Sequence, residues 1–222
     1  MIAKKLLNTD FTPLHPSSTI SAALAKMDAW HSSSIPVIEP ATKKMVGHVL
    51  FENIADVGDE SLPISEIEMQ NPVYAFENQH VFEIARQMLQ HEVRLLPVVD
   101  RSESYLGIIE KKTVLEALST MLNITTTGSV ITVEMTRQDF TMAELVHLIE
   151  VEGARILGLT VEQPEMDESI IQVSIKLSHE DTSAVISSLQ RHGYSTSTEN
   201  RTDLTQIDLT SRADELIRYL DV

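Results

Sequence analysis

The sequence predicts an α/β fold made of two copies of one unit, followed by a separate α+β domain. The duplication is read from two matching stretches, because Met27–Gly47 recurs as Met88–Gly107. Each stretch contains an apolar run with a Pro-Val pair. The prolines of the two runs, Pro36 and Pro97, lie 61 residues apart. Two copies are too few for a solenoid, which needs about three repeats to bury its ends. We therefore expect the copies to close on each other.

Each copy begins with an extended X-Pro step, at Thr12-Pro13 and at Asn71-Pro72. Apolar residues then follow at helical spacing, namely Ile20, Ala23, Leu24 and Met27 in the first copy and Val81, Ile84, Ala85, Met88 and Leu89 in the second. Short β-branched runs predict two strands per copy, over 35–38 and 45–50 and over 95–99 and 106–109. A helix closes each copy, over 52–57 and over 113–122. This order is typical of an α/β module.

The order of elements changes after Leu122. Alternating and helical apolar patterns predict strand, helix, strand, strand, helix and strand, over 131–135, 142–149, 157–161, 171–177, 185–189 and 194–198. This βαββαβ order is ferredoxin-like. An amphipathic pattern behind Ser211 predicts a C-terminal helix. The predicted domains are therefore 1–60 and 61–124 for the two copies, a linker over 125–128, and 129–222 for the last domain with its helix.

The doubled unit resembles a pair of CBS domains, and Ile2–Leu7 and Ile64–Met69 fit the short lead-in segment of each copy. Residues 129–199 look like an ACT domain. Together they are similar to small bacterial CBS-ACT regulatory proteins of the acetoin-utilisation type, and the pair is similar to the accessory region of inosine monophosphate dehydrogenase. The resemblance implies a pseudo-two-fold pair with two clefts that bind adenosine-containing nucleotides. AMP, ATP and S-adenosylmethionine are therefore the candidate ligands.

The candidate cleft residues follow from this resemblance and flank the Pro-bearing strands and the closing helices. They are Thr12, Ser33, Ser34, Ile35, Pro36 and Asn53 in the first copy, and Asn71, Arg94, Leu95, Leu96, Pro97, Lys111, Lys112 and Thr113 in the second. In the family, a Ser/Thr and an Asp behind the Gly-apolar-apolar run bind the ribose. This chain has Leu50 and Asn53 there in one copy and Glu110 and Thr113 in the other. Neither copy carries the Asp.

Three cations make the second copy the better candidate for an anionic ligand. Arg94 lies just before the Pro-bearing strand, and Lys111 and Lys112 begin the closing helix. A helix N-terminus favours anions. The alternative is that all three are solvated surface cations. In the ACT-like part, Arg137 and Asp139 occupy the turn where the family has a Gly-containing ligand-binding turn, and Arg137 is a candidate for a carboxylate; otherwise this domain serves dimerisation.

Composition limits the remaining functions. The formal net charge of −16 repels phosphate backbones, so we expect no binding to nucleic acid. The sequence has no cysteine and no apolar run of about 20 residues, so we expect a cytoplasmic protein without disulfides and without a membrane span. The eight histidines form no metal motif, and no catalytic constellation is present. We expect a homodimeric regulator with an unidentified protein target; an adaptor that has lost its ligand is the alternative, and an enzyme is disfavoured.

Overall fold

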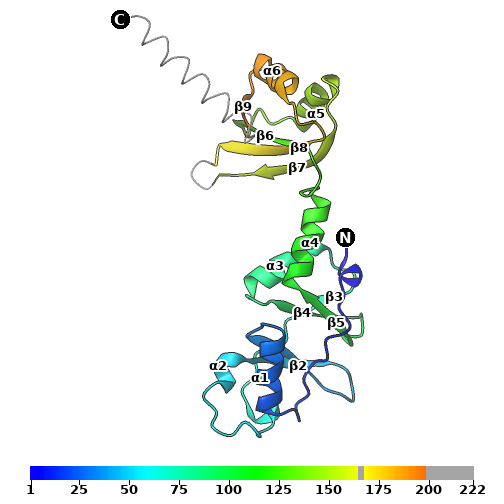
Figure 1. Ribbon diagram of the computed structural model, residues 1–222, viewed down its shortest axis with the longest axis vertical. Helices are drawn as coiled ribbons and strands as arrows, with labels where there is room; N and C mark the ends of the chain where they lie inside the picture. The colour runs from blue at the N-terminus through cyan, green and yellow to red at the C-terminus, as the bar shows by residue number, and fades with distance from the viewer. Residues whose placement is uncertain (165–167, 199–222) are drawn as a thin grey trace, which may run out of the picture. The chain divides into compact units, whose positions relative to one another are not determined.

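The computed structural model describes residues 1–164 and 168–198, and the chain divides into two compact units at residues 119 and 120 (Figure 1). The first unit contains both copies of the repeat. The second contains the βαββαβ domain. The C-terminal helix predicted behind Ser211 lies outside the described residues. No helix in the described ranges is long and apolar enough to cross a membrane.

The first repeat consists of α1 (Ile20–Ala29), β1 (Ser34–Ile38), β2 (Met45–Leu50) and the short α2 (Phe51–Ile54). Thr19 caps α1, because its hydroxyl oxygen accepts a hydrogen bond from the backbone N–H of Ala22 at 3.2 Å. The strands β1 and β2 are antiparallel. The predicted helix and strands of this repeat are thus present, with α2 shorter than the expected span.

The second repeat follows the same plan with α3 (Val81–Gln90), β4 (Leu95–Val99), β5 (Tyr105–Glu110) and α4 (Lys111–Met121). It adds β3 (Ala75–Phe76), which pairs in parallel with β4. In the first repeat a single parallel bridge between Leu14 and Val37 takes the place of β3. The sequence analysis did not predict β3, because two residues carry no periodicity.

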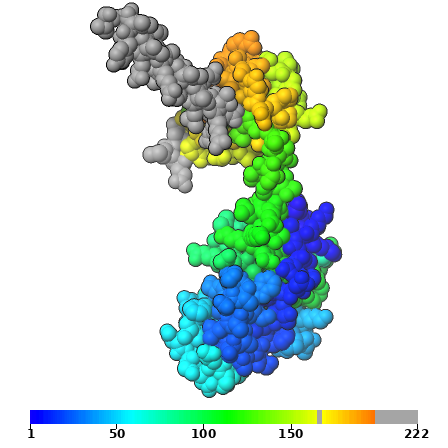
Figure 2. Space-filling model, in the orientation of Figure 1, coloured from blue at the N-terminus to red at the C-terminus, as the bar shows by residue number. Residues whose placement is uncertain are grey.

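The lead-in segments, which contain the 3-10 turns η1 (Ala3–Lys5) and η2 (Ile64–Glu66), cross between the repeats. Asn8 pairs with Ile108 on β5, through backbone hydrogen bonds of 2.8 and 3.0 Å. Gln70 pairs with His48 on β2 in the same way, at 2.9 and 3.0 Å. Figure 1 shows the N-terminal segment running beside β5, and Figure 2 shows it lying against residues of the second repeat. The lead-in segment of each repeat is therefore hydrogen-bonded to the second strand of the other.

Two glycines allow this close approach. A Cβ added at Gly47 would lie 2.6 Å from the carbonyl oxygen of Gln70, and one at Gly107 would lie 2.7 Å from that of Asn8. Real Cβ atoms do not come so close to a backbone oxygen. The glycine at the third position of β2 and of β5 is thus required by the lead-in segment beside it.

The core of the first repeat includes residues of the second. Ile20, Ile35 and Val49 are fully buried, and they share a cluster with Leu95 and Ile108. Full burial of such a side chain contributes roughly 1.5–3 kcal/mol. The two repeats are therefore one packing unit.

The second unit is a four-stranded antiparallel sheet with two helices. Its elements are β6 (Ser129–Thr136), α5 (Met142–Val151), β7 (Ile156–Glu162), β8 (Ile170–Leu177), α6 (Ser183–Arg191) and β9 (Ser195–Thr198), and the strand order is β7-β8-β6-β9. Figure 1 shows α5 and α6 on one face of the sheet. The side chains of Ile131, Val133 and Ile175 alternate along their strands into the core beneath the helices. The predicted ferredoxin-like order is confirmed.

Candidate functional site

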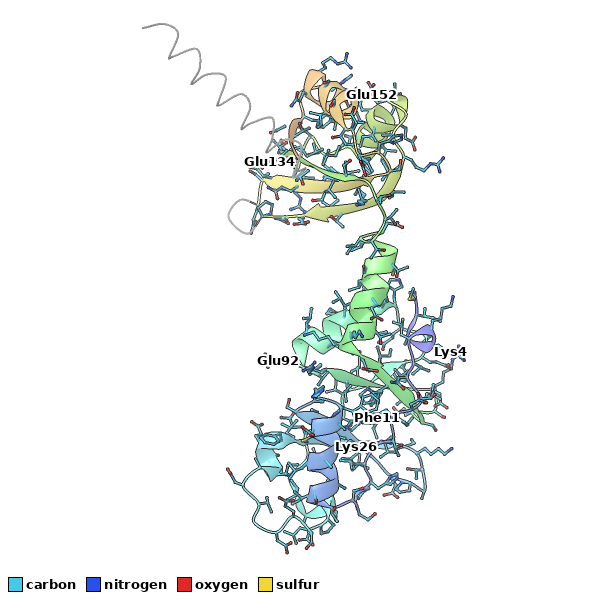
Figure 3. The ribbon with its side chains drawn as sticks, in the orientation of Figure 1. Lys4, Phe11, Lys26, Glu92, Glu134 and Glu152 are labelled. Atoms are coloured by element: carbon cyan, nitrogen blue, oxygen red, sulfur yellow. The ribbon has the colours of Figure 1, made fainter. Side chains whose placement is uncertain are left out.

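The first unit holds a cavity of about 440 Å³ that is lined by residues from both repeats. The first repeat contributes the start of β1, the end of β2 and the start of α2. The second contributes the segment behind Gln70 and the turn between α3 and β4, where Glu92 lies (Figure 3). The lining residues are Ser33, Ser34, His48, Leu50, Phe51, Glu52, Gln70, Val73, His91, Glu92 and Val93. This volume is in the range of small-molecule sites.

His48 is the buried polar group of this cavity, with 3% of its surface exposed. Its Nε2 lies 3.0 Å from the carbonyl oxygen of Val73, and its Nδ1 lies 3.3 Å from Oγ of Ser34. A carbonyl oxygen only accepts hydrogen bonds, so Nε2 carries the hydrogen of the neutral ring. Nδ1 is then the acceptor, and the Ser34 hydroxyl donates to it. The oxygen of Ser34 is left with lone pairs for the cavity.

Burial lowers the pKa of His48 below its ordinary value, because the charged ring would lose its hydration. The hydrogen bond to the Val73 carbonyl opposes this effect on the pKa, and the charge of His91 adds to it. His48 is therefore neutral at pH 7, which agrees with the tautomer that its partners require.

The structure brings together part of the candidate set of the first copy. Ser33 and Ser34 line the cavity, and Ile35 and Pro36 are buried behind them in β1. Asn53 lies apart from the lining, and its amide donates to the carbonyl oxygen of Glu68 at 2.9 Å. The carbonyl oxygen of Thr12 accepts from Nζ of Lys26, which lies over the ring of Phe11 at 5.1 Å (Figure 3).

Several lining residues were missed by the sequence analysis, among them His48, Phe51 and Glu92. The signal for His48 was available, because it is the one polar side chain inside the apolar run Met45–Leu50. Phe51 and Glu52 follow directly behind β2. His91 and Glu92 belong to the other repeat, and only the closed pair brings them to this cavity.

The candidate residues of the second copy occupy the equivalent positions around β4 and α4. The backbone N–H of Lys111 donates to the carbonyl oxygen of Arg94 at 2.9 Å, as that of Phe51 donates to Ser33 at 2.8 Å. Arg94, Lys111 and Lys112 are exposed, and Lys112 lies 3.8 Å from Glu116. Leu95, Leu96 and Pro97 are buried in β4, Thr113 is half-buried, and Asn71 is exposed.

The ribose-binding positions also differ between the copies. Leu50 lines the cavity of the first copy. Its counterpart Glu110 accepts a hydrogen bond from the side-chain amide of Asn8 at 2.8 Å, so its carboxylate holds the crossing segment.

In the second unit, a cavity of about 720 Å³ lies beside the turn between β6 and α5. Asp139 lines it together with Glu134 and Glu144, whereas Arg137 is not among its described lining residues. Oδ2 of Asp139 accepts from the Thr136 hydroxyl at 2.6 Å. Burial raises the pKa of Tyr194 at this cavity, and Glu144 adds to the shift. The lining is acidic and does not match a carboxylate ligand.

Within the described ranges, no three His, Asp or Glu side chains are grouped closely enough to hold a metal ion. The chemistry that the first cavity offers is hydrogen bonding, apolar contact and an aromatic face.

Comparison with known proteins finds a family match in the second copy of the repeat. The CBS domain family profile matches residues 64–120 of this chain. It is 27% identical over 109 residues to the CBS domain-containing protein YhcV of Bacillus subtilis, covering 48% of this chain and 77% of that protein. It is 24% identical over 114 residues to the inosine-5'-monophosphate dehydrogenase of Methanocaldococcus jannaschii, covering 51% of this chain. That match spans only 23% of the enzyme.

A solved structure of a CBS domain pair/ACT domain protein from Thermotoga maritima has the same fold over 55% of this chain and 99% of its own. Its TM-score is 0.51 and its sequence identity is 24%. This likeness is one of fold, and it agrees with a tandem of CBS repeats.

Proposed function

We propose that this chain is a cytoplasmic regulatory protein that binds a small metabolite in its CBS clefts and carries no catalytic activity of its own. The observation that supports the proposal is the composition of the first cavity, whose walls come from both repeats. A ligand bound there contacts both repeats at once. Binding therefore stabilises one arrangement of the pair, and this change in population is the signal to a protein target.

An adenosine nucleotide is the proposed ligand of the second cleft. Arg94 and Lys111 lie next to each other, and Lys112 follows at the first turn of α4. All three are exposed cations near a helix N-terminus, where the helix dipole also favours an anion. A phosphate group is the part of a nucleotide that these cations would bind.

The signal is proposed to pass through a homodimer. Large apolar side chains are exposed on α3 and α4 of the second repeat, with Phe82 at 54%, Leu89 at 66% and Leu115 at 66%. The α1 positions that correspond to Phe82 and Leu89 are occupied by Ser21 and Asp28. Exposed apolar side chains on these helices are suited to contact with the same surface of a second chain around a two-fold axis.

Isothermal titration with AMP and ATP tests the proposed function. We expect saturable heat and a raised melting temperature, and we expect the double variant Lys111→Gln/Lys112→Gln to weaken AMP binding at least about tenfold. Lys43→Gln, which removes an exposed cation from the β1–β2 hairpin, is the matched control and leaves AMP binding unchanged. No heat and no melting shift with AMP, ATP or S-adenosylmethionine up to millimolar concentration would refute ligand binding.

The alternative function is that of an adaptor that has kept the fold without a ligand. The specific observation in its favour is that Leu50 and Glu110 replace the ribose-binding hydroxyls, with Glu110 already bonded to Asn8. A negative titration together with a stable homodimer in light scattering would support this alternative.

A further inference from the structure

We propose that the two clefts take ligands of opposite charge preference, and that the cavity of the first repeat binds an uncharged or cationic heteroaromatic ligand rather than a phosphorylated one. This inference deepens the proposed function and rests on it. It concerns the cavity that the sequence analysis ranked behind the second cleft.

The charge of the lining disfavours a phosphate group in this cavity. Glu52 and Glu92 both line it, and the described lining residues include neither Lys nor Arg. Counted from Gly47 and Gly107, Glu52 corresponds to Lys112. A phosphate dianion would approach two carboxylates here, whereas the same group meets cations in the second copy. The repulsion is screened by salt because both carboxylates are exposed.

The walls of the cavity suit a flat ring. The side chain of Phe51 lines the cavity and is 50% exposed, so one face of its ring is available for stacking. Leu50, Val73 and Val93 supply apolar contacts. In the second copy the position of Phe51 is taken by Lys111, which offers no such face.

Ser34 adds a preference for a hydrogen-bond donor. Its hydroxyl hydrogen is directed to Nδ1 of His48, because the Nε2 hydrogen of that ring is directed to the Val73 carbonyl. Toward the cavity, Oγ of Ser34 therefore offers lone pairs only. A ligand amino group matches this oxygen, and a ring without a donor at that place does not.

Three probes separate these features: adenosine, AMP, which adds a phosphate, and purine riboside, which lacks the 6-amino group. Titrations use the full chain at pH 8, where ordinary imidazoles are neutral. We expect Phe51→Ala to weaken adenosine binding at least about fivefold and to leave AMP unchanged. We expect Lys112→Gln to weaken AMP binding at least about fivefold and to leave adenosine unchanged.

The donor preference has its own comparison. Adenosine should bind at least about fivefold more tightly than purine riboside, and Ser34→Ala should remove that difference. Circular dichroism and melting curves check that each variant is folded. Purine riboside binding as tightly as adenosine would overturn the donor preference.

The outcomes distinguish this inference from the proposed function. If Phe51→Ala weakens AMP binding and Lys112→Gln does not, the proposed difference in charge preference between the clefts is wrong. The proposal that the chain binds a ligand would still hold. If AMP binds and adenosine does not, the inference fails and the proposed function again stands. If none of the three probes binds, this inference fails, and the titrations with ATP and S-adenosylmethionine then decide the proposed function.

Discussion

The two repeats of this chain have hairpins with the same backbone irregularities and differ in their surface residues. Both hairpins carry a bulge at the same place, between Val37 and Ile38 and between Val98 and Val99. Non-glycine residues with positive φ also recur, at His31 and Lys43 in one copy and at Glu92 and Glu103 in the other. The residues at the proposed ligand sites differ between the copies. Phe51 and Glu52 of the first copy correspond to Lys111 and Lys112 of the second. Duplication has kept the scaffold and left each cleft with its own chemistry.

The largest expected effect tests whether the stability of the first unit depends equally on the two lead-in segments that cross between the repeats. Gly47→Ala and Gly107→Ala each place a Cβ within 2.7 Å of a backbone oxygen, so we expect each to lower the free energy of unfolding by about 2–3 kcal/mol. Urea unfolding measures the change. Gly58→Ala is the control, because nothing lies within 4 Å of its added Cβ, and it should be near neutral. A large loss for one crossing glycine alone would break the equivalence of the repeats.

The next effect concerns the exposed apolar side chains of α3, which α1 of the first repeat lacks at the equivalent positions. Leu89→Asp places a charge on the proposed dimer surface, so we expect the dimer Kd to rise at least about tenfold, which corresponds to about 1.4 kcal/mol. Sedimentation measures the Kd. Asp28→Asn at the equivalent position of α1 should leave it unchanged. A wild-type monomer at micromolar concentration, or equal effects of both variants, would contradict the proposed surface.

The side-chain amides of Asn8 and Asn53 allow a second comparison, because each forms one hydrogen bond between the two repeats. Asn8 donates to Glu110 at 2.8 Å, and Asn53 donates to the carbonyl oxygen of Glu68 at 2.9 Å. We expect Asn8→Ala and Asn53→Ala each to destabilise the first unit by about 1 kcal/mol in chemical unfolding. Asn78→Ala, at an exposed position, serves as the reference and should cost less. If Asn8→Ala or Asn53→Ala cost no more than Asn78→Ala, the hydrogen bond of that asparagine would contribute nothing to stability.

The smallest effect is a pH dependence confined to the first repeat. The pKa of His48 is lowered in the folded chain, so below the ordinary value of about 6.5 the unfolded chain binds more protons than the folded one. Stability is therefore fully present above that pH and falls as the pH drops below it. We expect His48→Ile, which installs the residue of the second copy, to flatten this part of the melting-temperature profile. His31→Gln, at an exposed position, should keep the wild-type slope.

The elements of the fold were predictable because their signals are local. The spacing of apolar residues in 20–27 and 81–88 gave the helices, and the Pro-Val runs gave β1 and β4. The pairing of Asn8 with Ile108 joins positions 100 residues apart, and no local pattern indicates it. The strand β3 was not predicted, because two residues are too few to show an alternating apolar pattern.

The candidate site was predicted less well than the fold. The sequence analysis favoured the second copy because Arg94 and Lys111 are cations. The described cavity lies in the first copy, around His48. The hydrogen bonding of Ser34 depends on which nitrogen of the His48 ring bears the hydrogen. The carbonyl oxygen of Val73, 25 residues along the chain, determines this. Only the closed pair places His91 and Glu92 opposite β2.

The exchange of lead-in segments has a consequence for how such a pair arises. A single copy of this unit would lack the backbone hydrogen bonds that its second strand makes with a lead-in segment, since that segment is supplied by the neighbouring copy. Two separate chains could satisfy each other by the same exchange, which is the geometry of a domain-swapped dimer. Fusion of two such chains would then convert an association that depends on concentration into one that holds at any dilution.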